Sequence, residues 1–148
     1  MPQRSDMFEV GPSSRLTVLL PDEQEEWHQT VRRLLEPQGI QTLSARTGRD
    51  AIELMESQAV HVAVLDVQMP QLGGLQVVKR IRELHKGEPS RVPPAILVAN
   101  DLTSHLLREA LSQHVFSVLS KPVDYGLLLD ALARVIRRRY ESRWPGLS

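Results

Sequence analysis

The chain has 148 residues, and its 18 lysines and arginines balance 18 aspartates and glutamates, so the formal net charge is zero. This length is typical of one domain and is sufficient to bury an independent core. A neutral chain argues against a protein that binds nucleic acid or a membrane surface through bulk positive charge, so we expect neither partner. The absence of cysteine excludes disulfides, thiolate zinc sites, iron–sulfur clusters and cysteine nucleophiles.

Targeting signals are absent from the sequence. The first fourteen residues contain no apolar run long enough for the core of a signal peptide. No later segment approaches the roughly 20 apolar residues that cross a bilayer. We therefore expect a cytoplasmic protein with a flexible segment over residues 1–14, a folded domain over residues 15–140 and a tail over residues 141–148.

From Leu16 onward, short apolar runs alternate with longer segments whose apolar residues recur at helical spacing. This alternation is typical of βα units built on a parallel sheet. The expected strands are residues 16–20, 40–44, 61–65, 95–99 and 115–119. A helix is expected after each strand, and the fourth helix is expected over residues 103–112. The inward-facing residues of the other four helices, in chain order, are Trp27, Val31, Leu34 and Leu35 in the first; Ala51, Ile52 and Met55 in the second; Leu75, Val77, Val78, Ile81 and Leu84 in the third; and Leu128, Ala131, Leu132, Val135 and Ile136 in the fifth.

Charged residues follow several of these strands, including Asp101 after the fourth. Asp22 comes after the first strand, Asp66 directly after the third, and Lys121 after the fifth. In an open parallel sheet, the carboxyl ends of the strands form the ligand-binding edge. Magnesium prefers one or two carboxylates together with water and phosphate oxygens, and a lysine neutralises a phosphoryl oxygen. The pattern therefore predicts a site for a divalent cation and a phosphoryl group.

The segments LLPDE, VLDVQMPQLGG and LSKPVD resemble the receiver domain of response regulators in two-component signalling. Asp-x-x-Met-Pro-x-x-x-Gly after an apolar strand, combined with Lys-Pro after the last strand, is a specific combination. The resemblance covers about residues 16–140. It implies an α/β fold of the flavodoxin-like, doubly wound (βα)5 type, with a five-stranded parallel sheet of order 2-1-3-4-5.

The same resemblance assigns roles to individual residues. Asp66 matches the aspartate that accepts a phosphoryl group from a histidine kinase or a phosphotransfer protein. Mg²⁺, or another divalent cation, would be held by Asp22, Asp66 and the backbone carbonyl of Gln68. Lys121 matches the lysine that pairs with the aspartate or its phosphoryl group, and its bond to Pro122 is expected to be cis. Such a domain is not an enzyme, because it assists only its own phosphorylation and dephosphorylation.

Three positions depart from the family pattern. Pro21 stands where a second acid usually reaches the metal through water, so weakened magnesium binding is expected. Ala99 replaces the usual threonine or serine, whose hydroxyl bonds the phosphoryl group. Val118 replaces an aromatic residue that moves inward together with that hydroxyl. A switch needs a contact that differs between its two states, so we expect the usual coupling to be absent or rebuilt.

Several functional alternatives stay open. We expect output through contacts with an unknown downstream protein, or through a homodimer, on the surface of the fourth helix, fifth strand and fifth helix. The three departures also suit a pseudo-receiver, a phosphorylation-independent interaction module. An aspartate-nucleophile phosphatase would carry Asp-x-Asp, whereas this chain has Asp66-Val67-Gln68, and a nucleotide-binding sheet would need a glycine-rich phosphate loop.

The end of the last expected helix is strongly basic. Residues 134–143 hold five arginines and one glutamate, a local charge of +4. Positive charge at a helix C-terminus complements the helix dipole. We favour a solvated helix end over a docking patch, because charge runs of this size are common on solvated faces.

Overall fold

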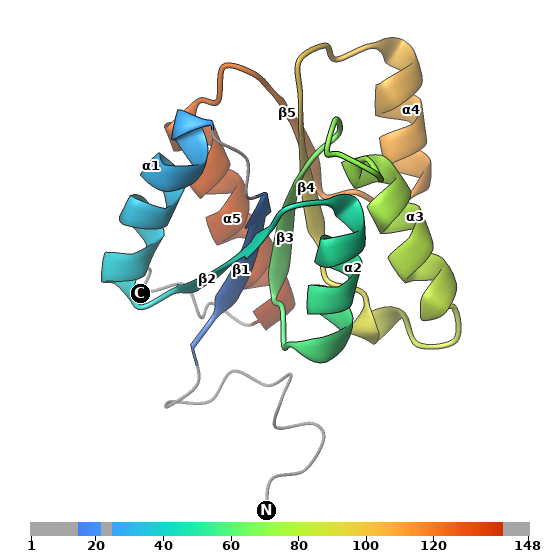
Figure 1. The fold of residues 1–148 in the computed structure, drawn as a ribbon, viewed down its shortest axis with the longest axis horizontal. Helices are drawn as coiled ribbons and strands as arrows, with labels where there is room; N and C mark the ends of the chain where they lie inside the picture. The colour runs from blue at the N-terminus through green and yellow to red at the C-terminus, as the bar shows by residue number, and fades with distance from the viewer. Residues whose placement is uncertain (1–14, 22–24, 141–148) are drawn as a thin grey trace, which may run out of the picture.

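Strands and helices alternate along the chain in the computed structural model, which describes residues 15–21 and 25–140 (Figure 1). The predicted flexible segment and tail, residues 1–14 and 141–148, lie outside this range, as does Asp22. The elements are β1 (Thr17–Pro21), α1 (Glu26–Leu35), the 3₁₀ helix η2 (Glu36–Gln38), β2 (Gln41–Ala45), α2 (Gly48–Ser57), β3 (Val62–Asp66), α3 (Gly74–Leu84), the 3₁₀ helix η3 (Pro89–Arg91), β4 (Ala95–Ala99), α4 (Ser104–Ser112), β5 (Ser117–Ser120) and α5 (Tyr125–Tyr140).

The strands form one parallel sheet in the order β2-β1-β3-β4-β5. This order confirms the predicted flavodoxin-like, doubly wound fold. The central strand β3 pairs with β1 on one side and with β4 on the other, where Asp66 lies opposite Val98. All five residues of β3 are buried, as expected for an apolar strand covered on both faces.

Helices cover both faces of the sheet, with α1 and α5 on one side and α2, α3 and α4 on the other (Figure 1). Because successive side chains along a strand point to opposite faces of the sheet, neighbouring residues pack into different cores. In β3, Val64 packs with the α1 and α5 side, whereas Ala63 and Leu65 pack with the other three helices. The sheet therefore separates two apolar cores.

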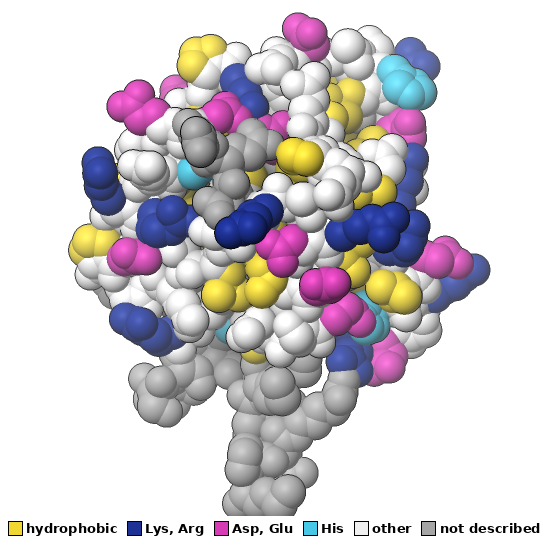
Figure 2. Space-filling model, in the orientation of Figure 1, with side chains coloured by type: hydrophobic (Ala, Val, Ile, Leu, Met, Phe, Trp, Pro, Cys, Tyr) yellow, Lys and Arg dark blue, Asp and Glu magenta, His cyan; other side chains and the backbone are white. Residues whose placement is uncertain are grey.

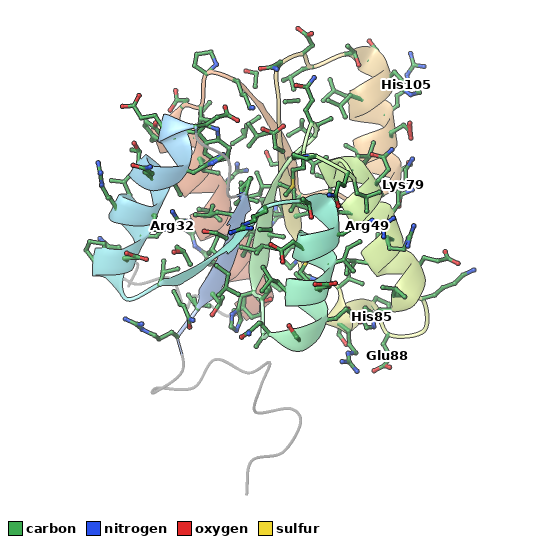
Figure 3. The ribbon with its side chains drawn as sticks, in the orientation of Figure 1. Arg32, Arg49, Lys79, His85, Glu88 and His105 are labelled. Atoms are coloured by element: carbon green, nitrogen blue, oxygen red, sulfur yellow. The ribbon has the colours of Figure 1, made fainter. Side chains whose placement is uncertain are left out.

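Polar contacts join the helices to one another and to the sheet edge, and they include the side chains of Arg32 and Lys79 that are labelled in Figure 3. Arg32 of α1 donates hydrogen bonds to the hydroxyls of Thr42 and Ser44 on the edge strand β2. Lys79 of α3 forms a 2.8 Å ion pair with Glu109 of α4. Figure 2 shows positive and negative side chains mixed over the visible face, as expected for a chain without net charge.

The ends of the elements agree with the sequence interpretation to within one residue for the first four strands. The predicted start of the fifth strand at Val115 is wrong, because β5 begins at Ser117. The amide of Val115 instead donates to the carbonyl of Ala110, which closes the end of α4. Thr103 directly precedes α4, and its hydroxyl caps the helix by accepting a hydrogen bond from the amide of Leu106.

Two predicted core leucines are exposed. Leu34 is 39% exposed and Leu84 is 53% exposed. Val31 and Leu35 lie one turn apart and form the buried stripe of α1, and Leu34 is rotated about 100° away from Leu35. Leu84 is the last residue of α3, one turn beyond the buried Ile81. No helix in the described part of the chain combines the length and apolar character needed to cross a bilayer.

Gly74 allows α3 to begin directly against the backbone of β3. A Cβ atom at this position would lie 2.7 Å from the carbonyl oxygen of Asp66 and 3.0 Å from the Cβ of Leu65. These separations are too short for a methyl group to be accommodated without a shift of the backbone. The glycine that ends the Asp-x-x-Met-Pro-x-x-x-Gly pattern is thus required by packing beneath the aspartate.

We expect Gly74→Ala to lower the free energy of unfolding by about 1–3 kcal/mol, because the added methyl group overpacks the contact with β3. Urea denaturation measures this change. Gly87→Ala is the matched control, since a Cβ at Gly87 meets nothing within 4 Å. Equal losses in the two variants would contradict the close-approach explanation.

Candidate functional site

The carboxyl edge of the sheet brings together two of the predicted site residues. Asp66 is the last residue of β3, and Lys121 follows the last residue of β5. Their side chains meet, with Nζ of Lys121 2.5 Å from Oδ2 of Asp66. The two residues are 55 positions apart in sequence, so this contact depends on the parallel arrangement of β3, β4 and β5.

Asp66 is held in a buried environment. The residue is 1% exposed. Its Oδ1 accepts a hydrogen bond of 2.8 Å from the backbone amide of Gln68, which fixes the rotation of the carboxylate. Its Oδ2 is paired with the ammonium group of Lys121 and has no other hydrogen-bond donor among the described residues. A buried carboxylate is costly unless it is paired, so Lys121 is the main source of compensation.

Glu25 is a third member of the site that the sequence interpretation missed. Its Oε2 accepts a 3.0 Å hydrogen bond from Nζ of Lys121, and its Oε1 accepts one from the indole of Trp27. Glu25 is the residue directly before α1. A Glu at a helix start is ordinary dipole chemistry, so no local signal in the sequence predicts a bond to a lysine 96 positions away.

Two carboxylates therefore share one ammonium group. Burial alone would lower the pKa of Lys121, but the pairing with Asp66 and Glu25 outweighs this effect and raises the pKa above its ordinary value of 10.5. Lys121 consequently stays charged across the physiological pH range, and it neutralises part of the negative charge that the site collects.

The loops after the strands are joined to one another around this ion pair. The side-chain amide of Asn100, after β4, donates a 3.0 Å hydrogen bond to Oε1 of Gln68, after β3. The backbone amide of Lys121 donates to the carbonyl of Ala99 at 2.9 Å. The bond between Lys121 and Pro122 is cis, as predicted.

The three atypical positions lie next to the site. Pro21 is the buried last residue of β1, and Ala99 is the last residue of β4 and 3% exposed. Ala99 supplies only a methyl group where the resemblance expects a hydroxyl. Val118 is half-buried and packs with the core on the α4 side of the sheet.

The described donors suit a hard divalent cation only in part. Asp66 offers a buried carboxylate whose Oδ2 is paired only with Lys121 among the described residues, and Mg²⁺ prefers carboxylate oxygen ligands. The predicted second carboxylate, Asp22, lies outside the described residues. Within residues 15–21 and 25–140, no group of three His, Asp or Glu side chains is placed to hold a metal ion.

The fold and this edge define a flavodoxin-like α/β domain with a buried aspartate–lysine pair at the carboxyl ends of its strands. A family model for the response regulator receiver domain matches residues 18–133. The crystal structure of a signal receiver domain of an HD domain-containing protein from Pseudomonas fluorescens Pf-5 is 29% identical, with a TM-score of 0.75, over 86% of this chain and 99% of that chain.

Two full-length relatives extend the comparison. Response regulator RR06 of Streptococcus pneumoniae is 26% identical over 84% of this chain, which spans 55% of that protein. The sensory/regulatory protein RpfC of Xanthomonas campestris is 26% identical over 80% of this chain, which spans 16% of that protein. The chain belongs to the response regulator receiver domain family of two-component signalling. It corresponds to only part of the length of these two relatives.

We expect Lys121→Met to lower the free energy of unfolding at neutral pH by about 3 kcal/mol, because it leaves the buried Asp66 carboxylate without its counter-charge. The folded state binds the Lys121 proton more tightly than the unfolded state. The contribution is therefore complete below pH 10.5 and is lost as the pH rises through the higher folded pKa. Urea denaturation of both proteins between pH 7 and about 11.5 tests this.

Lys79→Met is the matched control for this prediction. Lys79 also forms an ion pair with a glutamate, but both side chains are about one-third exposed. Such a pair contributes less than about 1 kcal/mol. A loss in Lys79→Met as large as that in Lys121→Met would contradict the role assigned to burial.

Proposed function

We propose that this receiver domain accepts a phosphoryl group on Asp66 from a histidine kinase or phosphotransfer protein in the cytoplasm. The observation that carries the proposal is the buried Asp66 carboxylate, oriented by the amide of Gln68 and paired with Lys121 at 2.5 Å. An acid that only ended a strand would face water. This one instead lies at the ligand-binding edge of the sheet beside a charged donor.

The reaction is a phosphoryl transfer from nitrogen to oxygen. An Asp66 carboxylate oxygen attacks the phosphorus of a phosphohistidine, in line with the leaving imidazole nitrogen. The new O–P bond forms as the P–N bond breaks, and the imidazole takes up a proton. Lys121 lies where its ammonium can neutralise charge on the transferred group. Glu25 keeps this ammonium in place through its 3.0 Å hydrogen bond.

Mg²⁺ would be held by Asp66 together with Asp22 and the backbone carbonyl of Gln68. When bound, such an ion neutralises negative charge on the phosphoryl oxygens. Pro21 cannot contribute a ligand from its side chain, so this proposal includes weaker magnesium binding than in a domain with two acids after β1. Asp66 and Gln68 meet in the structure through the 2.8 Å bond from the Gln68 amide.

Output is proposed to pass through the surface formed by α4, β5 and α5, to another protein or a second copy of the chain. Large apolar side chains are exposed there, with Leu111 of α4 77% exposed and Leu127 of α5 57% exposed. The strand β5 is also an edge strand of the sheet. Exposed apolar side chains beside an open strand edge are typical of an interaction surface.

The buried methyl group of Ala99 supports the second candidate, a pseudo-receiver that acts without phosphorylation. A hydroxyl at this place would give the phosphorylated state a hydrogen bond that the unphosphorylated state lacks. Ala99 cannot supply that difference, and Val118 cannot supply a ring. The two candidates differ in whether Asp66 is modified and whether α4 responds.

We expect the wild-type chain, incubated with phosphoramidate and Mg²⁺, to gain one phosphoryl group by intact-mass measurement. Asp66→Asn should remain unlabelled, because an amide is not a nucleophile for this transfer. Asp130→Asn is the matched control: Asp130 pairs with Arg134 on the exposed side of α5 and lies outside the site. Its labelling should equal that of the wild type. Removal of divalent cations with EDTA should abolish labelling.

Two results would contradict phosphorylation on Asp66. A label that persists in Asp66→Asn would place the modification at another residue. A folded wild-type chain that stays unlabelled while a standard receiver domain is labelled in parallel would favour the pseudo-receiver.

A second prediction concerns the switch. Beryllofluoride with Mg²⁺ mimics the phosphoryl group, and we expect it to leave amide exchange in α4 of the wild type nearly unchanged. Ala99→Thr combined with Val118→Tyr should produce a clear change in α4 exchange, because it restores both missing groups. Hydrogen–deuterium exchange measures this, with α2 as the internal reference. A large α4 response in the wild type would show that other residues have replaced the usual coupling.

A further inference from the structure

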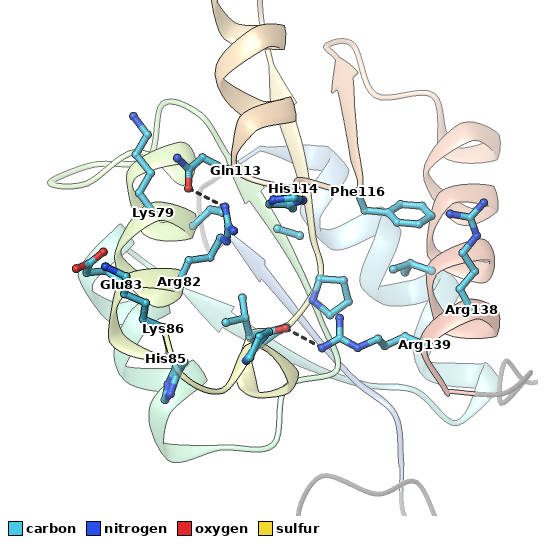
Figure 4. Close-up of a pocket in the computed structure, with 17 residues that line it drawn as sticks. Lys79, Arg82, Glu83, His85, Lys86, Gln113, His114, Phe116, Arg138 and Arg139 are labelled. Atoms are coloured by element: carbon cyan, nitrogen blue, oxygen red, sulfur yellow. Dashed lines mark hydrogen bonds between the residues drawn. The ribbon is translucent and has the colours of Figure 1, made fainter.

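A cavity of about 770 Å³, whose lining side chains are drawn in Figure 4, lies at the amino-terminal end of β4. Its walls come from α3, the segment around η3, the start of β4, the turn before β5, and α5. Ala95, the first residue of β4, lines it, whereas Asp66 and Lys121 lie at the carboxyl ends of their strands. Its volume falls within the range of about 300–1,000 Å³ that is typical of small-molecule sites.

Four basic side chains line this cavity without a carboxylate partner among the described residues: Arg82, Lys86, Arg138 and Arg139. The guanidinium of Arg82 donates to the uncharged side chain of Gln113 at 3.1 Å. The guanidinium of Arg139 donates to the carbonyl of Val92 at 3.0 Å. These bonds orient the two arginines from opposite walls (Figure 4) but leave their charge uncompensated.

The other charged groups of the cavity do not cancel this charge. Lys79 is neutralised by Glu109 of α4, and His85 contacts Glu56 of α2 at 2.6 Å. Glu83 is the one carboxylate among the lining residues that the structure describes. A chain with zero net charge thus concentrates unpaired positive charge at one concave site, which favours an anionic ligand.

Apart from Gln113 and His114, the remaining lining residues are apolar or aromatic. Val92 and Pro94 contribute apolar surface, and Phe116 contributes a ring. The guanidinium of Arg138 lies 5.7 Å from the centre of that ring, in cation–π range. A flat ligand can pack against Phe116 and Arg138, since guanidinium groups stack on planar rings. The cavity therefore combines groups that bind phosphates with groups that bind a planar base.

We propose that this cavity binds a nucleotide, with its phosphates on Arg82, Lys86 and Arg139 and its base against Phe116 and Arg138. An acidic peptide would match the charge, but an extended segment would make little use of the aromatic wall or of a hollow between α3 and α5. The arginines at the end of α5 remain exposed, as the sequence interpretation expected. Two of them also form one wall of this site.

Titration of the ¹⁵N-labelled full-length chain tests the proposal. The ligands are ATP, GTP, pyrophosphate and adenosine, without divalent cations so that the Asp66 site does not contribute. We expect saturable chemical-shift changes at the amides of Lys86, Gln113, His114 and Phe116 with at least one nucleotide. Pyrophosphate should bind more weakly, and adenosine should produce no change, because each supplies only part of the required chemistry.

Charge-reversal variants separate this site from general attraction to basic protein. Arg138→Glu should weaken nucleotide binding about tenfold, because it removes the guanidinium that stacks against the base and introduces a negative charge that repels the phosphates. Arg137→Glu changes the charge equally at the neighbouring residue of α5, but Arg137 does not line the cavity. The dissociation constant of the Arg137→Glu variant for the nucleotide should therefore stay within about twofold of the wild-type value.

Four results would overturn the proposal. The first is the absence of saturable changes with either nucleotide, and the second is equal weakening by Arg137→Glu and Arg138→Glu. The third is pyrophosphate binding as tight as nucleotide binding, which would exclude a role for the aromatic wall. The fourth is a glutamate-rich peptide that perturbs the same amides at lower concentration than the nucleotides, which would identify the surface as a docking site for acidic protein segments.

Discussion

The ion pair between Asp66 and Lys121 is the constraint on which the rest of the site depends. A carboxylate that is 1% exposed would be costly without a counter-charge, and the nearest one comes from the end of β5, two strands away in the sheet. Glu25 extends the pair to α1, and the amide of Gln68 fixes the carboxylate from its own loop. Three separate segments of the chain are therefore held at one edge by charge.

Packing beneath the aspartate supports this arrangement. Gly74 lets α3 begin close to the backbone of β3, which a Cβ atom would prevent. Ala99 at the end of β4 and Val118 in β5 fill space without offering a polar group. The site thus combines a buried, charge-paired carboxylate with apolar side chains at the two positions where the family resemblance expects a hydroxyl and an aromatic ring. At the amino-terminal end of β4, arginines of α3 and α5 that lack a carboxylate partner among the described residues line one cavity.

Much of the fold could be predicted because periodicity is a local property. The first four strands follow from short patterns and fall within one residue of their predicted places. The start of β5 could not be predicted, because Val115 is as apolar as a strand residue but is used to close α4. Leu34 and Leu84 show a similar limit, since an apolar residue is buried only if a neighbouring element covers it.

The sequence by itself determined the alternation of elements, the family resemblance, and the identity of Asp66 and Lys121 as candidate site residues, because apolar periodicity and a specific short motif encode them. Only the tertiary structure decided that Glu25 completes the ion-pair network and that arginines from two helices share a cavity. These groups are far apart in the chain, and their energies depend on distance and burial. The distances between these groups and their burial are set only when the strands are aligned in one sheet.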